Sequence, residues 1–354
     1  MGLLCLLAVA ARAEEIADTT PPAIAKPERS RILRLNLEEI YYLQGLELEE
    51  QSSHEHAVIT RENNVTSWLD RQHGRLFRWL DNRVRWVDMA WLGEKRAYDP
   101  ELSTFRLSTM TRVGGRSSEK EFDIKVRFRG DFALPALSHR LHVFLDNVGR
   151  ESLPGKDPMQ QDSNTRLGIR AMLKTLKNSE LSANGGLRWR RSHPVAYAGV
   201  DWRYARPVGD AVYAFTPRVV YYTDDGFAQQ AIMTWTRQVG ERKIFQVRLG
   251  ERSAENMDGV EFEQSLRFAW LRSGRGRGWV AQASVFPHLE SSDWYWDDSL
   301  INVAWRDALY RKWIYYTIIP QLQFPKEDQY EPRPSLRIGL DILFGGRIGE
   351  LLSH

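Results

Sequence analysis

The residues with the clearest capacity for catalysis are histidines that lie near serines or acids in the sequence. A serine hydroxyl becomes a nucleophile only when a base takes its proton, so a hydrolase needs a histidine beside a serine or a carboxylate cluster. The candidates are His139 and His142, His193 with Ser192, and His288 with Ser291, Ser292 and Asp293. None lies in a recognised catalytic motif. Isolated histidines at the ends of strands are commonly polar surface residues with no catalytic role. The sequence therefore predicts no catalytic residue, and a hydrolase stays an alternative.

Motifs that bind nucleotides, cofactors or metals are missing from the sequence. It has no P-loop, dinucleotide fingerprint, EF-hand loop or metal-spaced histidine pair on a helix. We therefore expect no cofactor and no metal site. The 49 Lys and Arg against 46 Asp and Glu give a formal charge of +3, which is too small to indicate nucleic acid as a partner.

The basic residues that could act on a solute lie where charged and apolar residues alternate. In residues 121–130, Ile124 and Val126 point to one side of an extended chain while Lys125 and Arg127 point to the other. The same texture recurs from residue 102 and predicts fourteen strands, at 102–113, 121–130, 139–146, 164–174, 179–190, 195–206, 211–222, 227–237, 243–252, 260–272, 279–289, 299–309, 313–324 and 335–344. If two neighbouring stretches form one bent strand, twelve is the alternative.

Strand length and connection length favour a membrane-spanning sheet. Each stretch is close to the roughly nine to eleven residues that a tilted membrane strand needs. Longer connections, among them residues 148–163, are expected outside the cell and alternate with tight periplasmic ones, as in barrels whose loops differ between the two membrane sides. The 13 Trp, 13 Tyr and 14 Phe could form aromatic girdles, although the cores of large β-sandwiches would use them too. The predicted fold class is all-β, an antiparallel up-and-down transmembrane barrel preceded by a short helical region.

The last regular stretch carries a resemblance to a known class. Its apolar face consists of Leu336, Ile338, Leu340, Ile342 and Phe344. The stretch resembles the C-terminal assembly signal of Gram-negative outer-membrane proteins, whose last strand alternates and ends on an aromatic residue, although here the chain continues to His354. The resemblance covers residues 102–344 and indicates the porin-like class, with no specific family matched. It implies an outer-membrane location, contact with membrane lipids and lipopolysaccharide, and recognition by the barrel assembly machinery.

The first hundred residues have a different character. Residues 1–13 combine an apolar run with the small-residue site Ala11-Arg12-Ala13, which is typical of a secretory signal. The single cysteine, Cys5, lies in that signal, so the mature chain has none, as suits an oxidising periplasmic route. Residues 14–100 are expected to be a periplasmic linker with amphipathic helices at 31–50 and 65–91, resting on the barrel rim or plugging it. The barrel takes residues 101–345, and 346–354 form a tail.

If the apolar residues of each predicted strand face the lipid, the alternating residues between them face the lumen, and many of these are cations. The predicted lumen-lining residues are Arg106, Arg112, Lys125, Arg127, Arg129, Arg166, Arg170, Arg188, Arg190, Arg203, Arg218, Arg248, Arg267 and Arg337. Cations outnumber acids there, and an excess of fixed positive charge favours anions in a pore. The predicted function is therefore a passive, porin-like channel for small, preferentially anionic solutes. Arginines paired with acids could instead fill the interior of a non-conducting scaffold or surface-binding protein, and an outer-membrane lipid hydrolase is the second alternative.

One predicted extracellular loop combines aromatic and acidic residues. Trp294, Tyr295 and Trp296 are followed by Asp297 and Asp298. Such a loop could stack a sugar, hold a divalent cation that bridges lipopolysaccharide phosphates, or extend an aromatic girdle. The sequence does not indicate an oligomeric state.

Overall fold

The computed structural model describes residues 67–68, 70–73, 75, 104–115, 122–133, 141–147, 152–161, 164–176, 178–190, 193–240, 242–273, 277–310 and 313–344. Within them lie fourteen strands: β1 (Thr104–Gly114), β2 (Phe122–Ala133), β3 (Leu141–Asp146), β4 (Thr165–Leu176), β5 (Ser179–Arg190), β6 (His193–Val208), β7 (Ala211–Tyr222), β8 (Gly226–Gln238), β9 (Lys243–Ala254), β10 (Val260–Ser273), β11 (Arg277–Glu290), β12 (Asp293–Tyr310), β13 (Ile314–Gln323) and β14 (Arg333–Phe344). The signal, the first predicted helix and the tail lie outside the described residues.

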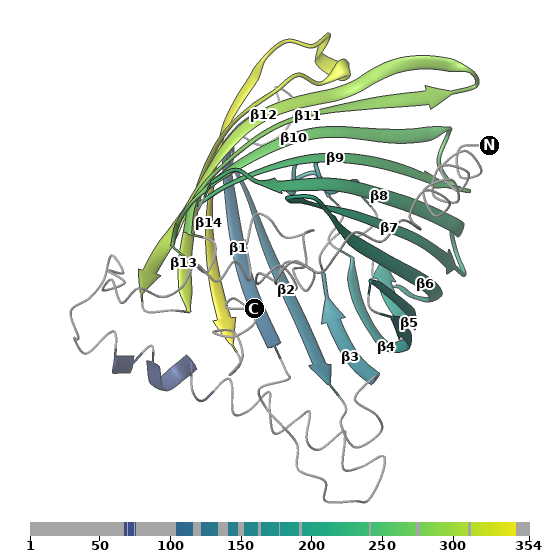
Figure 1. The fold of residues 1–354 in the computed structure, drawn as a ribbon, viewed down its shortest axis with the longest axis horizontal. Coiled ribbons are helices and arrows are strands. Elements are labelled where there is room, and N and C mark those ends of the chain that lie inside the picture. Colours follow the sequence, from purple (N-terminus) through teal and green to yellow (C-terminus); the bar gives the residue numbers. More distant parts are fainter. Residues whose placement is uncertain are drawn as a thin grey trace, which may run out of the picture. The chain divides into compact units, whose positions relative to one another are not determined.

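The fourteen strands close into one ring. Each strand pairs with its neighbours in the sequence, and β14 returns to β1 (Figure 1). That seam runs antiparallel through ten consecutive pairs, from Phe105 opposite Phe344 to Gly114 opposite Ser335. Closure gives every strand a partner on both sides, as a barrel in lipid requires. The shortest strand, β3, pairs only with Arg129–Ala133 of β2. The predicted up-and-down barrel is confirmed, with fourteen strands and not twelve.

The alternation of side chains located every strand, and β5 and β7 begin and end at the predicted residues. Most other bounds differ, as in β2, which extends to Ala133 and not to Gly130. The expected loop at Trp294–Trp296 was wrong. These residues belong to β12, which begins at Asp293 and pairs Trp296 with Pro287 and Trp294 with Leu289. The connection is only a two-residue turn at Ser291 and Ser292, whose φ angles of 47° and 79° match the turn type that suits a twisted hairpin.

The outward side of the wall is apolar and exposed. On β2 and β14, Phe122 (54%), Ile124 (55%) and Ile338 (48%) are exposed, and the same holds for Leu266 and Ile301 on other strands. The apolar row continues past the bulge in β12, where Trp294 lies against Phe262 with ring centroids 5.2 Å apart. A soluble protein of this size does not expose such a continuous apolar surface.

The inward side is polar and buried. Arg267, Gln246 and Glu263 are each only 1% exposed, and Arg337 is equally covered. A sheet with buried charges and exposed branched apolar residues reverses the arrangement of a soluble core. This reversal positions the candidate site, because it brings charged residues from every part of the ring to one central space.

A short helical stretch within residues 67–75 packs against one end of the barrel. The Tyr310 hydroxyl donates to Asp70 at 3.0 Å, and the His73 ring nitrogen Nε2 lies 2.8 Å from the Leu343 carbonyl oxygen. The His73 ring also stacks on Trp313 and Phe344, at centroid distances of 4.1 and 4.6 Å. This part of the second predicted helix therefore lies where β12 and β14 end. The rest of the predicted helical region lies outside the described residues.

Candidate functional site: the barrel lumen and its infolded segment

The connection from β3 to β4 enters the barrel. Its residues 152–161, which we call the infolded segment, bind inner-wall side chains of strands far apart on the ring. Lys125 on β2 donates to the Gln161 carbonyl at 2.9 Å, Gln230 on β8 donates to the Ser152 carbonyl at 3.2 Å, and Gln282 on β11 donates to the Gly155 carbonyl at 3.0 Å. Only a segment inside the ring can reach all three strands.

Asp157 is the charged centre of the infolded segment. Its carboxylate accepts hydrogen bonds from Arg337 at 2.7 Å, from Gln321 at 2.8 Å and from the Met159 amide at 2.8 Å. A second guanidinium, that of Arg112, lies 3.9 Å away. Burial alone raises the pKa of Asp157, but Arg337 and these hydrogen bonds outweigh it and hold the pKa below the usual aspartate value. The carboxylate is therefore ionised at neutral pH.

Close packing at Gly155 holds the opposite side of the segment. The Gly155 amide donates to Glu263 at 2.8 Å, and Glu263 also accepts from Arg248 and from Ser265, at 2.6 Å each. A side chain on residue 155 would collide with the Glu263 carboxylate and with the Ser265 hydroxyl. Glycine is required because the backbone must approach the wall this closely.

Lys156 joins the segment to the β10 and β12 walls. Its ammonium lies 2.9 Å from Glu261 and 3.6 Å from Asp297. Asp297 reaches the lumen because β12 has a bulge there: Phe286 pairs with Asp298 while the next residue of β11 pairs with Trp296. A bulge of this kind turns an extra side chain toward one face of a sheet.

Six cations of β1, β2, β12 and β14 form what we call the basic wall: Arg106, Arg112, Lys125, Arg127, Arg306 and Arg337. Asp341 is shared by Arg106 at 3.0 Å and Arg306 at 3.4 Å. Asp157 is shared by Arg337 and Arg112, and Asp123 lies 4.0 Å from Arg112. Lys125 and Arg127 donate to backbone carbonyls of Gln161 and Pro158. Within the described part of the chain, three carboxylates lie against these six cations, which gives this group a formal charge of +3.

Most of the other predicted lumen residues form ion pairs along the wall. Arg166 pairs with Asp146 at 2.8 Å, Arg170 with Asp131 at 3.2 Å, and Arg218 with Asp201 at 3.2 Å. Arg188 and Arg190 both pair with Asp224 and Asp225 in the turn after β7. Arg267 is buried and lies 3.4 Å from Gln246, Arg129 stands opposite Arg106 and Asp146, and Arg203 stands opposite Glu180.

Two of the histidine candidates, His288 and His142, make other contacts, whereas His139 and Ser192 lie outside the described residues. His288 directs Nε2 to the Asp258 carbonyl at 2.6 Å and stacks on Tyr295. His142 pairs with Asp131 at 2.7 Å, within the ion pair that Asp131 makes with Arg170. These histidines therefore serve wall and rim contacts, whereas a nucleophilic site needs the ring nitrogen at a hydroxyl.

Two further results concern the part of the chain that the structure describes. No helix in it is long and apolar enough to cross a membrane. No group of three or more His, Cys, Asp or Glu side chains in it is arranged to hold a metal ion.

Sequence reasoning missed the infolded segment, because residues 148–163 were expected to be an ordinary loop outside the barrel. It also missed the inward amides Gln230, Gln282 and Gln321. These side chains hold that segment, but they are uncharged, and the prediction of lumen residues was based on charge. One local signal was present, since Leu153 and Met159 are apolar residues within a polar connection and both are buried.

No protein-family model matches the chain, and no curated protein matches its sequence. Solved outer-membrane barrels are similar to it in fold. A bacterial polysaccharide outer-membrane secretin is 9% identical with a TM-score of 0.44, over 70% of this chain and 99% of that one. A loop L8 deletion mutant of OmpT from Vibrio cholerae is 10% identical with a TM-score of 0.44, over 68% and 98%. The outer-membrane channel DcaP of Acinetobacter baumannii is 6% identical with a TM-score of 0.42, over 68% and 96%. Likeness at this level concerns the barrel fold alone.

Proposed function

We propose that this protein is an outer-membrane channel for small solutes that favours anions, with the infolded segment narrowing its passage. The observation that carries the proposal is the segment itself. It crosses a polar lumen and is held there by Asp157 between Arg337 and Arg112, beside a basic wall with a formal charge of +3. Fixed positive charge in a narrow, water-filled passage lowers the barrier for anions and raises it for cations.

The proposed membrane location rests on the barrel wall, which is apolar on its outward side and charged on its inward side. Outward residues such as Ile124 and Ile338 are exposed while inward residues such as Arg337 are buried. Apolar side chains facing hydrocarbon and charges facing a lumen are the stable arrangement for a barrel in lipid. The C-terminal strand then serves as the assembly signal, the N-terminal region lies in the periplasm, and lipids with lipopolysaccharide surround the wall.

Conductance across a planar lipid bilayer tests the proposal. The purified full chain should produce discrete current steps, and the reversal potential in a potassium chloride gradient should indicate chloride as the preferred ion. Potassium gluconate in place of potassium chloride keeps the cation fixed and reports the size limit for anions. Current steps that favour potassium over chloride would contradict the inference that the basic wall makes the channel prefer anions.

A filled, non-conducting barrel is the second candidate. The observation that favours it is the burial of inner-wall charges, since Arg337, Arg267 and Glu263 are each only 1% exposed. Arginines paired across neighbouring strands can fill a barrel of this size. Correctly folded protein that inserts into bilayers without current steps would support this reading over the channel.

A further inference from the structure

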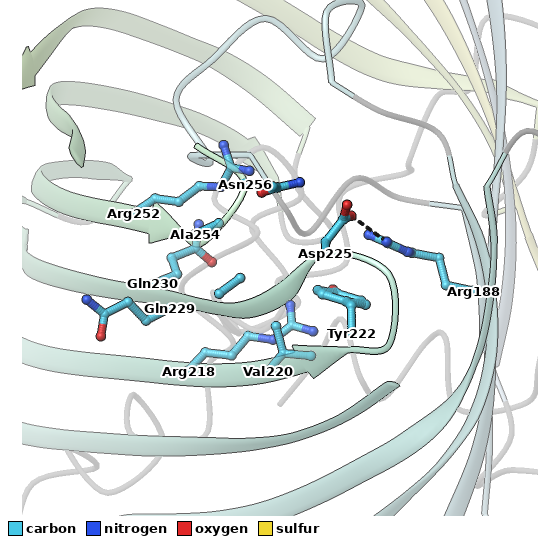
Figure 2. A pocket seen from close by; sticks show the side chains of 11 residues that line it. Arg188, Arg218, Val220, Tyr222, Asp225, Gln229, Gln230, Arg252, Ala254 and Asn256 are labelled. Atoms are coloured by element: carbon cyan, nitrogen blue, oxygen red, sulfur yellow. Dashed lines mark hydrogen bonds and ion pairs between the residues drawn. The ribbon is translucent and has the colours of Figure 1, made fainter. Parts of the chain in front are cut away.

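A pocket lies at the end of the barrel where β7 and β8 are joined, beside the start of the infolded segment. About 460 Å³ of space lies within and in front of it, part of which is open solvent. Figure 2 shows Arg188, Arg218 and Arg252 reaching it from β5, β7 and β9, with Tyr222 and Asn256 also in its lining.

The pocket has a positive lining. Three arginines and one acid, Asp225, belong to it, so the lining has a formal charge of +2. Burial raises the pKa of Asp225, but hydrogen bonds from Arg188 and Arg190 outweigh it and hold the pKa below the usual value. Asp225 is therefore an anion at neutral pH. It attracts Arg188 and disfavours solutes that carry more than one negative charge at the same point.

Two of the guanidiniums are placed to bind a solute. Arg218 contacts Asp201 through Nε at 3.2 Å, and Arg252 contacts Glu261 through Nη1 at 3.1 Å. A guanidinium has about five N–H donors, so one such contact leaves further donors on two arginines that line the pocket. Arg188 differs, because it is 2% exposed, binds the acids of the β7–β8 turn and covers the Tyr222 ring at 3.9 Å. Its role is to shape the pocket.

Neutral amides complete the lining. Gln230 belongs to the pocket and also donates to the Ser152 carbonyl at 3.2 Å, so the pocket directly adjoins the infolded segment. Asn256 lies near Arg252 in Figure 2. Amide side chains both donate and accept hydrogen bonds, which matches hydroxyl groups on a solute.

From this geometry we propose that the pocket is a capture subsite for small monocarboxylates that carry hydroxyl groups, with Arg218 and Arg252 binding the carboxylate. The inference rests on the proposed channel, whose solute class it narrows. Paired guanidinium donors fit the planar carboxylate, and charge-assisted hydrogen bonds are stronger than neutral ones. The position at the mouth would concentrate such solutes before they pass the infolded segment.

Isothermal titration calorimetry on the detergent-solubilised full chain tests the subsite without requiring conductance. D-gluconate is the probe, and D-glucose is its uncharged counterpart of similar size. We expect gluconate to bind and glucose to bind at least about tenfold more weakly, since charged hydrogen bonds are lost. R218Q and R252Q should each weaken gluconate binding about tenfold. R237Q is the matched control, because Arg237 is 50% exposed and pairs with Asp210 in another turn.

Equal binding of gluconate and glucose by the wild-type chain would overturn the inference whatever the variants do. So would a loss in R237Q as large as in R218Q, with circular dichroism showing that both variants fold. Inorganic phosphate that binds more tightly than gluconate would overturn the monocarboxylate assignment. Anion-selective current without gluconate binding would refute the subsite but not the channel. Gluconate binding without current would refute the channel but not the subsite.

Discussion

Replacing Asp157 by Asn should release the infolded segment while leaving the barrel closed. The substitution keeps the shape of the side chain but removes the charge that faces Arg337 at 2.7 Å and Arg112 at 3.9 Å. Both arginines are buried, at 1% and 4% exposure. The strands themselves are held by ladder hydrogen bonds around the whole ring, so the change acts on the docking of the segment.

The expected size of the effect follows from the burial of this cluster. Removing one partner of a buried ion pair costs roughly 3 to 5 kcal/mol, because it leaves an uncompensated charge. Each step of about 1.4 kcal/mol is a tenfold change in an equilibrium. The ratio of docked to released segment should therefore fall at least about a hundredfold in D157N.

Single-channel recording is the assay. D157N should show larger or more variable current steps than the wild-type chain, together with a lower midpoint of thermal unfolding. D210N is the matched control, since Asp210 is 59% exposed and its pair with Arg237 is a surface pair worth at most about 1 kcal/mol. Unchanged conductance and unchanged stability in D157N would refute the reasoning, because Asp157 would then not hold the segment.

The same cluster predicts a pH dependence. The pKa of Asp157 is lowered in the folded protein, so its contribution to docking is complete above the unfolded aspartate value of about 3.9. That contribution is lost as the pH falls through the lower, folded value. Wild-type current should therefore be steady from neutral pH to about pH 4 and should become larger or noisier only in stronger acid. D157N should already be in the released state at neutral pH and should lack this acid transition.

Three further predictions concern other parts of the molecule. Lys125→Glu or Arg127→Glu should move the reversal potential toward cation preference, because each reverses one charge of the basic wall. Ile124→Lys should destabilise the protein in lipid vesicles by about 2 to 4 kcal/mol near the midplane, measured by urea unfolding; an unchanged midpoint would argue against lipid contact at this residue. His73→Ala should remove stacking on Phe344 worth about 0.5 to 1.5 kcal/mol and speed proteolysis before β1, while β-strand circular dichroism stays the same.

The barrel could be predicted from the sequence because its rule is local. In a strand that faces lipid on one side and a lumen on the other, apolar and polar residues alternate along the chain, as Ile124 and Lys125 do. Its bounds are also local, since turns such as the one after Tyr222 interrupt the alternation. The start of β12 was missed because Trp294 and Trp296 pair with Leu289 and Pro287 around a bulge, and a bulge breaks the period on which the prediction depended.

The infolded segment could not be predicted, because its partners are remote in the sequence. Asp157 binds Arg337 and Gln321, and Gly155 binds Glu263, at separations of 180, 164 and 108 residues. No local pattern encodes contacts of that range. The cations on the wall were visible, but the acid that two of them share lay in a connection that looked like an ordinary loop.

Charge and obstruction are coupled in this lumen, because Asp157 both holds the segment and neutralises part of the basic wall. D157N should therefore increase current and anion preference together. Gly155→Val displaces the segment without removing the Asp157 carboxylate: a side chain there collides with the Glu263 carboxylate, while the formal charge of the lumen stays the same. G155V should increase current as D157N does, with a smaller gain in anion preference. If both variants gain anion preference equally, obstruction alone sets selectivity and the basic wall does not.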